Sequence, residues 1–270
     1  MQLMVYTADP VFSPRPWGDK SLNDVFSVAS EEPIGEVWLL SDMPSMTTML
    51  RSGDNEIAPS QIIESFAGKP LPRFPLLVKL ISTTSWLSYQ VHPDDEMART
   101  VENEPWGKSE CWFFLTDSII AAGLRRPDFF DSKTTFDEKS LNILHPYKGD
   151  AICIEPGLVH AIGPNTRLIE VQQSSDLTYR LFDWGRDRKL HIEKGNKAVK
   201  PYLEPHILRN CREISNDLFS VAMIKQASGT GIMLTLEERP VLRVVIDDVV
   251  ENEAEFMWIT LGDYWKEVSS

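Results

Sequence analysis

The chain has 270 residues, 42% of them hydrophobic, and a formal net charge of -13. A hydrophobic share of this size can form one large core or two smaller ones, so we expect a soluble globular protein. The negative charge argues against nucleic acid or an anionic membrane as a partner, because both are bound through clustered lysines and arginines. An anionic small molecule is compatible with this charge where basic residues concentrate, as they do in residues 180–200.

The N-terminal sequence and the cysteines bear on the cellular compartment. The first ten residues lack the basic start and apolar middle of a signal peptide, and no apolar run approaches membrane-spanning length. We therefore expect a cytoplasmic protein with no membrane partner. Cys111, Cys153 and Cys211 are widely spaced and form no Cys-x-x-Cys pair. This pattern favours neither a disulfide framework nor a thiolate zinc site, so we expect three small core residues.

The N-terminal part of the chain is predicted to form short strands separated by turns. Residues 3–6 and 37–40 are extended apolar runs, and closely spaced prolines exclude a helix across residues 12–19. Residues 58–68 begin near a proline, have helical apolar spacing and end at a glycine, which predicts a short helix. Residues 94–100 open with acidic side chains, which the positive end of a helix dipole favours.

Two apolar strands each carry a basic residue. Lys79 lies inside the nearly continuous apolar run 74–81, so its ammonium group has to reach the surface or meet an anion. Arg180 alternates with bulky residues in the run 178–184, and its planar guanidinium matches phosphate or carboxylate oxygens. Both residues are candidates for a ligand-facing position. The other basic residues up to residue 200 are expected to form a solvated loop.

The remaining segments favour a mostly β fold. Residues 128–147 have a mixed, charged pattern, for which we expect one or two helices and a loop. After residue 200 a turn-rich link leads into short apolar runs between residues 218 and 265. Many short strands punctuated by glycine and proline are typical of a sandwich or barrel. We therefore predict a β domain over residues 1–200 and a smaller β unit over residues 201–270.

Four polar residues are spaced as the ligands of one metal ion would be. Gln90 and His92 lie two apart in an extended run, so their side chains project from the same face. Glu110 begins a strand on its apolar face, where a buried carboxylate needs a cation as partner. His160 follows a Pro-Gly turn at the end of a β-branched run. The four residues together predict a single metal site.

The chemistry of these ligands indicates zinc. A mixed set of nitrogen and oxygen ligands suits zinc and leaves coordination positions open for water or substrate. Without a cysteine ligand, the site is more typical of catalysis than of structure. Gln90 is neutral, so Glu110 alone offsets the divalent ion, and the remaining positive charge can polarise a substrate oxygen. We predict one Zn²⁺ per chain acting on a hydroxy-carbonyl compound.

The order of these motifs resembles the type I mannose-6-phosphate isomerase family. The segments that carry the resemblance follow one another through roughly the first 190 residues: 16–18, 35–38, 87–95, 107–112, 149–162 and 170–184. The resemblance implies a cupin fold, that is, a double-stranded β-helix or jelly roll, with a few short helices. It also implies a zinc-dependent enzyme of carbohydrate metabolism that interconverts mannose 6-phosphate and fructose 6-phosphate through an enediol.

The family's functional residues fall on named positions of this chain. Its metal ligands correspond to Gln90, His92, Glu110 and His160, the four residues reached independently above. Its substrate-binding residues correspond to Lys79, Ser88, Lys108 and Arg180.

The catalytic roles implied by the resemblance follow from the charge of the reaction. Aldose-ketose isomerisation moves a proton between adjacent carbons, and an enediol oxygen becomes negative in the transition state. The metal, Lys108 and Arg180 would stabilise that charge. Arg180 is too basic to act as a general base, whereas a lysine desolvated beside a cation can have its pKa lowered. Lys108 is therefore the first candidate for the base.

Asp19 stands where a second glycine is usual and Glu155 where the turn usually has proline, and both departures are local. Residues 201–270 look shorter than the family's second cupin domain, and this departure keeps an alternative open. A non-catalytic cupin that keeps the metal and senses a sugar phosphate is therefore the alternative. An iron-dependent cupin dioxygenase fits less well, because Gln90 stands where that class would place another histidine. The sequence does not specify an oligomeric state.

Overall fold

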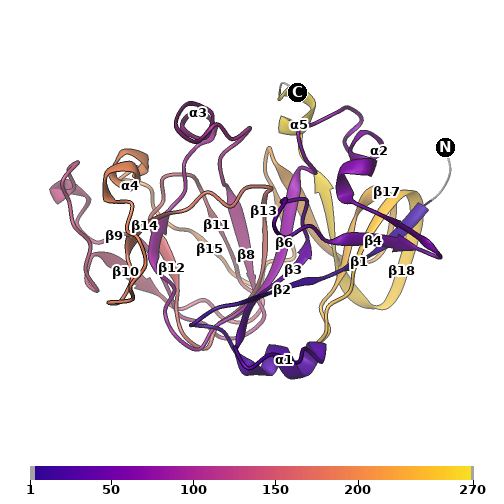
Figure 1. Cartoon of the computed structure of the whole chain (residues 1–270), viewed down its shortest axis with the longest axis horizontal. Coiled ribbons are helices and arrows are strands. Elements are labelled where there is room, and N and C mark those ends of the chain that lie inside the picture. The colour runs from indigo at the N-terminus through magenta and orange to yellow at the C-terminus, as the bar shows by residue number, and fades with distance from the viewer. Residues whose placement is uncertain (1–3, 269–270) are drawn as a thin grey trace.

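The computed structural model describes residues 4–268, and the mostly β fold expected from the sequence is confirmed (Figure 1). Its strands form three antiparallel sheets of five, seven and six strands. The seven-stranded sheet runs in the order β15 (Ile207–Leu208), β11 (Ala151–Ile154), β8 (Glu110–Phe114), β13 (Arg167–Gln173), β6 (Leu76–Ser82), β3 (Ile34–Leu40) and β2 (Val11–Pro14).

The other two sheets pack on opposite faces of this central sheet. The five-stranded sheet runs in the order β10 (Leu141–Leu144), β9 (Ile120–Leu124), β12 (His160–Ile162), β7 (Tyr89–Val91) and β14 (Tyr179–Phe182). The six-stranded sheet runs in the order β16 (Glu213–Ser215), β17 (Phe219–Thr235), β18 (Leu242–Leu261), β1 (Met4–Asp9), β4 (Met49–Ser52) and β5 (Asn55–Ile57).

Alternation along β8 shows how one strand serves both cores. Trp112 and Phe114 are buried in the cluster shared with the five-stranded sheet, whereas Cys111 and Phe113 are buried in the cluster shared with the six-stranded sheet. Successive strand residues point to opposite faces, so this arrangement follows from the pleat. Glu110 has the parity of Trp112 and therefore faces the five-stranded sheet. The predicted inward face of residues 110–114 is confirmed.

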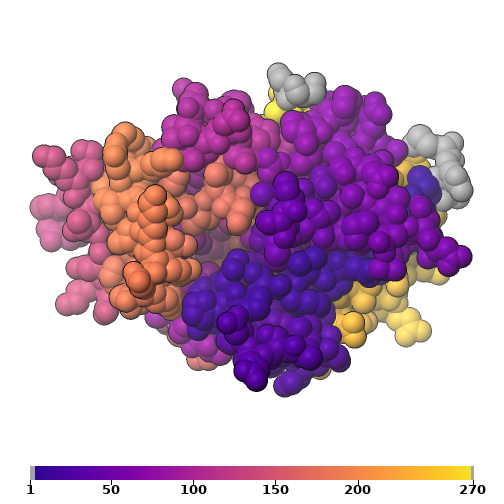
Figure 2. Space-filling view, viewed as in Figure 1, coloured from indigo at the N-terminus to yellow at the C-terminus, as the bar shows by residue number. Residues whose placement is uncertain are grey.

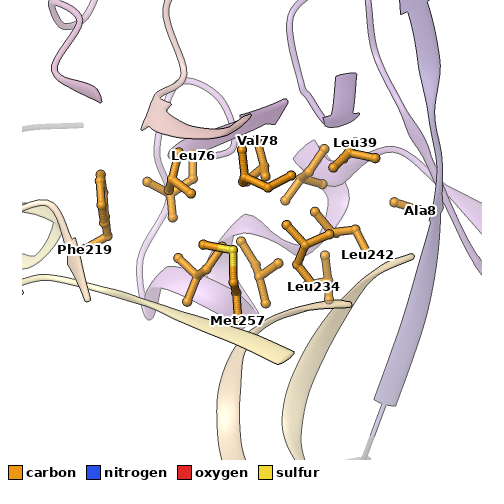
Figure 3. Close-up of a cluster of buried hydrophobic side chains, with 14 of the residues drawn as sticks. Ala8, Leu39, Leu76, Val78, Phe219, Leu234, Leu242 and Met257 are labelled. Atoms are coloured by element: carbon orange, nitrogen blue, oxygen red, sulfur yellow. The ribbon is translucent and has the colours of Figure 1, made fainter. Parts of the chain in front are cut away.

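The largest core lies between the seven- and six-stranded sheets. Figure 3 shows Leu76 and Val78 of β6 facing Leu234 and Met257 of the C-terminal strands. All four side chains are almost completely shielded from solvent. This core therefore joins the N-terminal and C-terminal parts of the chain.

The helices are short and lie at the ends of the sheets. They are α1 (Lys20–Phe26), α2 (Ile63–Ala67), α3 (Asp95–Met97), α4 (Ile192–Ala198) and α5 (Tyr264–Glu267), with helical turns at Pro59–Ile62, Ala98–Glu102 and Pro127–Phe129. None of those described is long and apolar enough to cross a membrane. The helices predicted over residues 58–68 and 94–100 are confirmed: Gly68 ends the first with a φ of 74°, and Asp94 caps the second.

Residues 128–147 differ from the sequence expectation. Between the helical turn Pro127–Phe129 and residue 147 the chain forms no α-helix within the described residues, and Leu141–Leu144 forms the edge strand β10 instead. Pairing with β9 explains the difference, because Leu141 is fully buried against the five-stranded sheet. The charged residues before it form turns closed by Asp131 and Asp137. Burial of a short run on a sheet edge outweighs the mixed local pattern.

The C-terminal strands are shared with the rest of the fold. β15 pairs with β11 in the central sheet, and β18 pairs with β1, placing Met4 opposite Ile246. The six-stranded sheet thus combines strands from both sides of residue 200. The division into residues 1–200 and 201–270 stays a prediction.

Cys111 and Cys153 form a disulfide, which corrects the expectation of three unpaired core cysteines. The two residues lie directly opposite each other on β8 and β11, with Cα atoms 4.0 Å apart. Facing positions on adjacent strands bring side chains together irrespective of their separation in sequence, which is 42 residues here. Cys211 is free and half-buried.

Candidate functional site

Three predicted metal ligands converge between the five- and seven-stranded sheets. His160 begins β12, His92 directly follows β7, and Glu110 begins β8 on the opposing sheet. One ligand atom from each lies within 4.8 Å of those of the other two, and all three side chains are fully buried. No other such group of three occurs among residues 4–268. Residues far apart in the sequence are thus brought to one point.

Both imidazoles are held in the orientation that a metal site needs. The Nδ1 atoms of His92 and His160 each lie 2.9 Å from a backbone carbonyl oxygen, of Leu177 and Leu158 respectively. Donation from Nδ1 leaves the lone pair on Nε2. The two Nε2 atoms each lie 3.5 Å from a carboxylate oxygen of Glu110. The lone pairs therefore point at the carboxylate.

The electrostatics favour two neutral imidazoles around an anion. Burial lowers the pKa of His92, and burial together with His92 lowers the pKa of His160 to about 3. Burial alone would raise the pKa of Glu110, but the charge of Lys108 holds it well below its usual range. Among the described residues, His92 Nε2 and Glu110 Oε1 have no hydrogen-bond partner. Unpaired buried groups of this kind are costly, so the donor set fits a divalent cation.

Gln90, the other predicted ligand, lies beside His160. It is the register partner of His160 across the β7–β12 pair, and its Nε2 atom lies 3.3 Å from His160 Nε2. The two ends of an amide exchange by half a turn about its last bond. That turn places Gln90 Oε1 beside the imidazole, where it can act as an oxygen ligand.

The residues expected to bind substrate line one cavity of about 290 Å³ beside the metal ligands. Its wall is formed by Arg15, Trp17, Glu36, Lys79, Ile81, Leu87, Ser88, Gln90, Lys108, Ile162, Glu170, Asp176, Thr178, Arg180 and Arg188. Figure 2 shows the surface hollowed between the indigo N-terminal segment and the orange segment near residue 190. Lys79, Ser88, Lys108 and Arg180 are therefore brought together.

Lys108 lines the cavity and contacts the predicted metal ligand Glu110. Its Nζ atom is 2.9 Å from Glu110 Oε2, and only 4% of the residue is exposed. Burial alone would lower the pKa of Lys108, but Glu110, Glu170 and Asp176 outweigh burial and raise it. With Glu110 as its ion-pair partner, Lys108 is a proton donor. Its role as general base stays a prediction, and it requires that a cation takes over the charge of Glu110.

A buried ion pair on the cavity wall includes a residue that the sequence interpretation missed. Lys79 Nζ lies 3.1 Å from Glu170 Oε1 and 4.7 Å from the centre of the Trp38 ring. Trp112 Nε1 donates to the other oxygen of Glu170 at 3.1 Å. Burial and the nearby Glu110 raise the pKa of Glu170. Glu170 stands in an apolar strand, where a charged side chain needs a partner of opposite charge. This argument singled out Lys79 from the sequence and applies equally to Glu170.

Glu36 is a second missed carboxylate. It accepts hydrogen bonds from Arg15 Nε at 3.2 Å and Trp38 Nε1 at 2.8 Å. Burial alone would raise the pKa of Glu36, but Lys79 and Arg15 lower it. Arg15 and Glu36 both line the cavity. Its position as a charged residue in the apolar strand 34–40 could have identified Glu36 from the sequence.

Three arginines surround the carboxylate of Asp183, and two of them, Arg180 and Arg188, line the cavity. Asp183 is almost fully buried; Arg186 Nη1 lies 3.1 Å and Arg188 Nη2 2.6 Å from its Oδ1, and Arg180 Nε 4.0 Å from its Oδ2. One carboxylate thus faces three guanidinium groups, which leaves net positive charge at the cavity rim. Arg188 lines the cavity, in contrast to the solvated loop expected for this segment.

The sequence matches known proteins along most of its length. Residues 15–110 match the family model "Phosphomannose isomerase type I, catalytic domain". The chain is 31% identical to mannose-6-phosphate isomerase ManA of Bacillus subtilis over 237 residues, which cover 81% of this chain and 75% of that protein. It is also 31% identical to the "Probable mannose-6-phosphate isomerase GmuF" of the same organism, over 77% of this chain and 72% of that protein.

The chain belongs to the type I phosphomannose isomerase family. The part matched by the phosphomannose isomerase model ends at Glu110 and includes Gln90 and His92. The predicted ligand His160 lies outside it and is placed by the register of β12 against β7.

Solved structures share the phosphomannose isomerase fold across nearly the whole chain. Mannose 6-phosphate isomerase from Bacillus subtilis has a TM-score of 0.67 at 23% identity, covering 96% of this chain and 97% of that one. A structure from Archaeoglobus fulgidus has a TM-score of 0.77 at 20% identity, covering 97% and 99%. A zinc-bound mannose 6-phosphate isomerase has a TM-score of 0.71 at 14% identity, covering 96% and 99%. The expected cupin fold is confirmed.

Proposed function

We propose that this chain is a mannose-6-phosphate isomerase that interconverts mannose 6-phosphate and fructose 6-phosphate with one Zn²⁺ per chain. Family membership supports the reaction. The observation that carries the proposal is the buried group of His92, Glu110 and His160, with an unpaired Nε2 and carboxylate oxygen, beside a cavity lined by basic side chains.

The proposed zinc ligands are Gln90, His92, Glu110 and His160. Zinc held there supplies a Lewis acid that polarises a substrate oxygen. The backbone carbonyls of Leu177 and Leu158 orient the two imidazoles, so the chain fixes the ligand geometry before substrate arrives.

We assign phosphate binding to the rim of the cavity where the arginines gather. Arg180 and Arg188 carry positive charge that Asp183 only partly offsets. A guanidinium presents two parallel N–H donors, which match phosphate oxygens. Binding energy from the phosphate can hold the reacting carbons in register, because it is remote from the chemistry. Ser88 lines the same cavity and is assigned a hydrogen bond to substrate.

We assign the stabilisation of the enediol's developing negative charge to Lys108, which lies beside the proposed metal ligands. Lys108 is buried, charged and 2.9 Å from Glu110, so it can donate to a substrate oxygen without reorganisation. For proton transfer between carbons, Lys108 remains one candidate, acting once a cation on Glu110 weakens the ion pair. Glu170 is the other, because burial and Glu110 raise its pKa toward the range of a general base.

We place the enzyme in the cytoplasm, within carbohydrate metabolism, because hexose phosphates are charged and do not cross membranes unaided. Disulfides rarely persist in that compartment. In that compartment we expect Cys111 and Cys153 as a dithiol at the same facing positions on β8 and β11.

The proposed function is tested with the purified protein. Bound metal is measured first, and fructose 6-phosphate formation from mannose 6-phosphate is then followed with and without a chelator. The expected result is one zinc per chain and turnover that the chelator abolishes and added Zn²⁺ restores. Stoichiometric zinc without turnover on any hexose phosphate would instead favour the sugar-phosphate sensor.

A further inference from the structure

The C-terminal helix α5 contacts the segment that precedes the metal ligand Glu110. Tyr264 Oη donates to Asp95 Oδ2 at 2.5 Å, across 169 residues of sequence. The Trp265 ring lies edge-on to Trp106, with ring centres 5.0 Å apart. Figure 1 shows α3 and α5 at the same end of the molecule. The last helix of the described chain is therefore attached to the loop that carries Lys108.

Helix α5 is itself firmly anchored. Trp265 is almost completely buried, and its Nε1 atom donates to Leu218 O at 2.7 Å, next to the start of β17. Trp106 is equally buried, and its Nε1 atom donates to Ser174 O at 2.9 Å. Each tryptophan thus ties its own segment to a sheet, and their contact joins the two segments.

Asp95 connects Tyr264 to the two residues that flank Lys108. Its Oδ1 atom accepts from Gly107 N at 2.8 Å and from Gln173 Nε2 at 3.3 Å. Gln173 Oε1 in turn accepts from Ser109 N at 2.9 Å. The backbone N–H groups of Gly107 and Ser109, the residues on either side of Lys108, are therefore linked to one carboxylate, whose other oxygen accepts from Tyr264.

The segment has little room to adapt without these contacts. A Cβ atom on Gly107 would come within 2.3 Å of Pro93 O and 2.6 Å of the Asp94 carbonyl carbon. Lys108 N also donates to Pro93 O at 3.2 Å. Residues 107–109 thus lie directly on the backbone of residues 93–95, and a shift of Asp95 would move Lys108 with it.

We propose that Tyr264 and Asp95 are positioning residues for Lys108, so that the C-terminal helix sets the geometry of the active site. The proposal rests on the proposed function, because it assigns Lys108 to the stabilisation of the enediol. Neither Tyr264 nor Asp95 lines the substrate cavity. Their effect is on placement, and a displacement of about 1 Å can cost up to about a hundredfold in rate.

Tyr264→Phe tests this proposal, since it removes one hydroxyl and keeps the ring. We expect kcat to fall by roughly three- to tenfold, with KM for mannose 6-phosphate within about twofold of wild type. Zinc content and Tm should stay close to the wild-type values. Tyr202→Phe is the matched control, because Tyr202 Oη also donates to an aspartate, Asp128, at 3.3 Å but lies on an exposed surface. An unchanged kcat in Tyr264→Phe would overturn the proposal.

A double-variant cycle tests whether the two residues act together. Asp95→Asn keeps an oxygen for Gly107 N but removes the charge that Tyr264 contacts. If both residues act through Lys108, the activity of the double variant Tyr264→Phe/Asp95→Asn equals that of the less active single variant. Multiplying losses would show independent effects and contradict the proposal.

Amide hydrogen exchange provides a readout that needs no turnover. In Tyr264→Phe the amides of Gly107 and Ser109 should exchange several-fold faster than in wild type, whereas Tyr202→Phe should leave them unchanged. Faster exchange in a protein that never isomerises mannose 6-phosphate would refute the proposed function but support the positioning role. Unchanged exchange at both amides would refute the positioning role whatever the activity.

Discussion

His160 of β12 lies directly opposite Gln90 of β7, and their side-chain nitrogens are 3.3 Å apart. This pairing brings two residues that are 70 positions apart to the same end of the five-stranded sheet. The carboxylate of Glu110 reaches them from the facing sheet, so the candidate metal centre exists only once both sheets have packed.

His160→Ala is expected to lose zinc and activity together. Its Nε2 atom is one of the three converging ligand atoms, and no other imidazole within the described chain is placed to replace it. The check is zinc per chain by atomic spectroscopy beside the isomerase assay. A variant that retained stoichiometric zinc would show that His160 is not a ligand.

Arg180→Ala is expected to keep its zinc and lose at least about a hundredfold in kcat/KM, because a charge-assisted contact to substrate disappears. Arg180→Lys should recover only part of this loss, since an ammonium lacks the planar fork of donors. Steady-state kinetics with metal analysis of each variant separates the two effects. Full turnover in Arg180→Ala would mean that the side chain does not face the substrate.

Lys79 and Glu170 should reveal their buried ion pair in unfolding experiments. Removing one partner, as in Lys79→Met or Glu170→Gln, leaves the other group buried without its counter-charge and should cost about 3–5 kcal/mol of unfolding free energy. The double variant should be less destabilised than the sum of the single variants. Urea unfolding curves provide the measurement, and additive losses would argue against a direct interaction.

The lowered pKa of Asp150 predicts that the stability of the fold depends on pH. Burial alone would raise its pKa, but the backbone N–H groups of Tyr147 and Asn210 and the guanidinium of Arg209 lower it below its ordinary value of 3.8. A carboxylate with a lowered pKa in the folded state stabilises the fold above its unfolded pKa, and this contribution is lost as the pH falls through the folded pKa. Asp150→Asn should therefore be less stable than wild type at neutral pH.

The same variant should approach wild-type stability once the pH has fallen through the lowered folded pKa of Asp150, because the folded carboxyl is then protonated as well as the unfolded one. Denaturant unfolding of both proteins between neutral and acidic pH gives the difference directly. A difference that stayed constant across this range would exclude Asp150 as its source.

The disulfide predicts one free thiol in the oxidised protein. Alkylation of the denatured, unreduced chain should label Cys211 alone, and reduction should expose Cys111 and Cys153 as well. Reduction should lower the unfolding free energy by about 2–4 kcal/mol, because the unfolded chain gains conformational freedom. Cys153→Ser should show the same loss without reductant. Labelling of three thiols before reduction would mean that the bond does not form.

The predicted metal ligands could be proposed from the sequence because strand geometry is local, and the structure brings three of them, His92, Glu110 and His160, together. Gln90 and His92 share a face through the two-residue period, and Glu110 is a carboxylate on an apolar strand face, so neither inference requires the tertiary fold. The pairing of Cys111 with Cys153 depends on which strands are neighbours, and spacing along the chain does not contain that information. Glu36 and Glu170 were within reach of the reasoning used for Lys79 and were overlooked.

Asp95 marks the limit of interpretation from a local pattern. Its position after Asp94 at the start of a helix explains an acidic residue fully, and the helix does begin there. Its contacts with Gly107, Gln173 and Tyr264 come from three separate parts of the fold. No window of sequence around Asp95 indicates them.

The pairing of β1 with β18 also constrains the order in which the protein can fold. Met4 lies opposite Ile246, so β1 cannot gain this neighbour until the ribosome has synthesised nearly the whole chain. Until then the apolar face of β6 lacks the strands that cover it, and contacts this distant in sequence form slowly. The predicted metal ligands are therefore synthesised well before the segment that completes their support, and the nascent chain passes through a stage that has all of these residues but is not yet a finished enzyme.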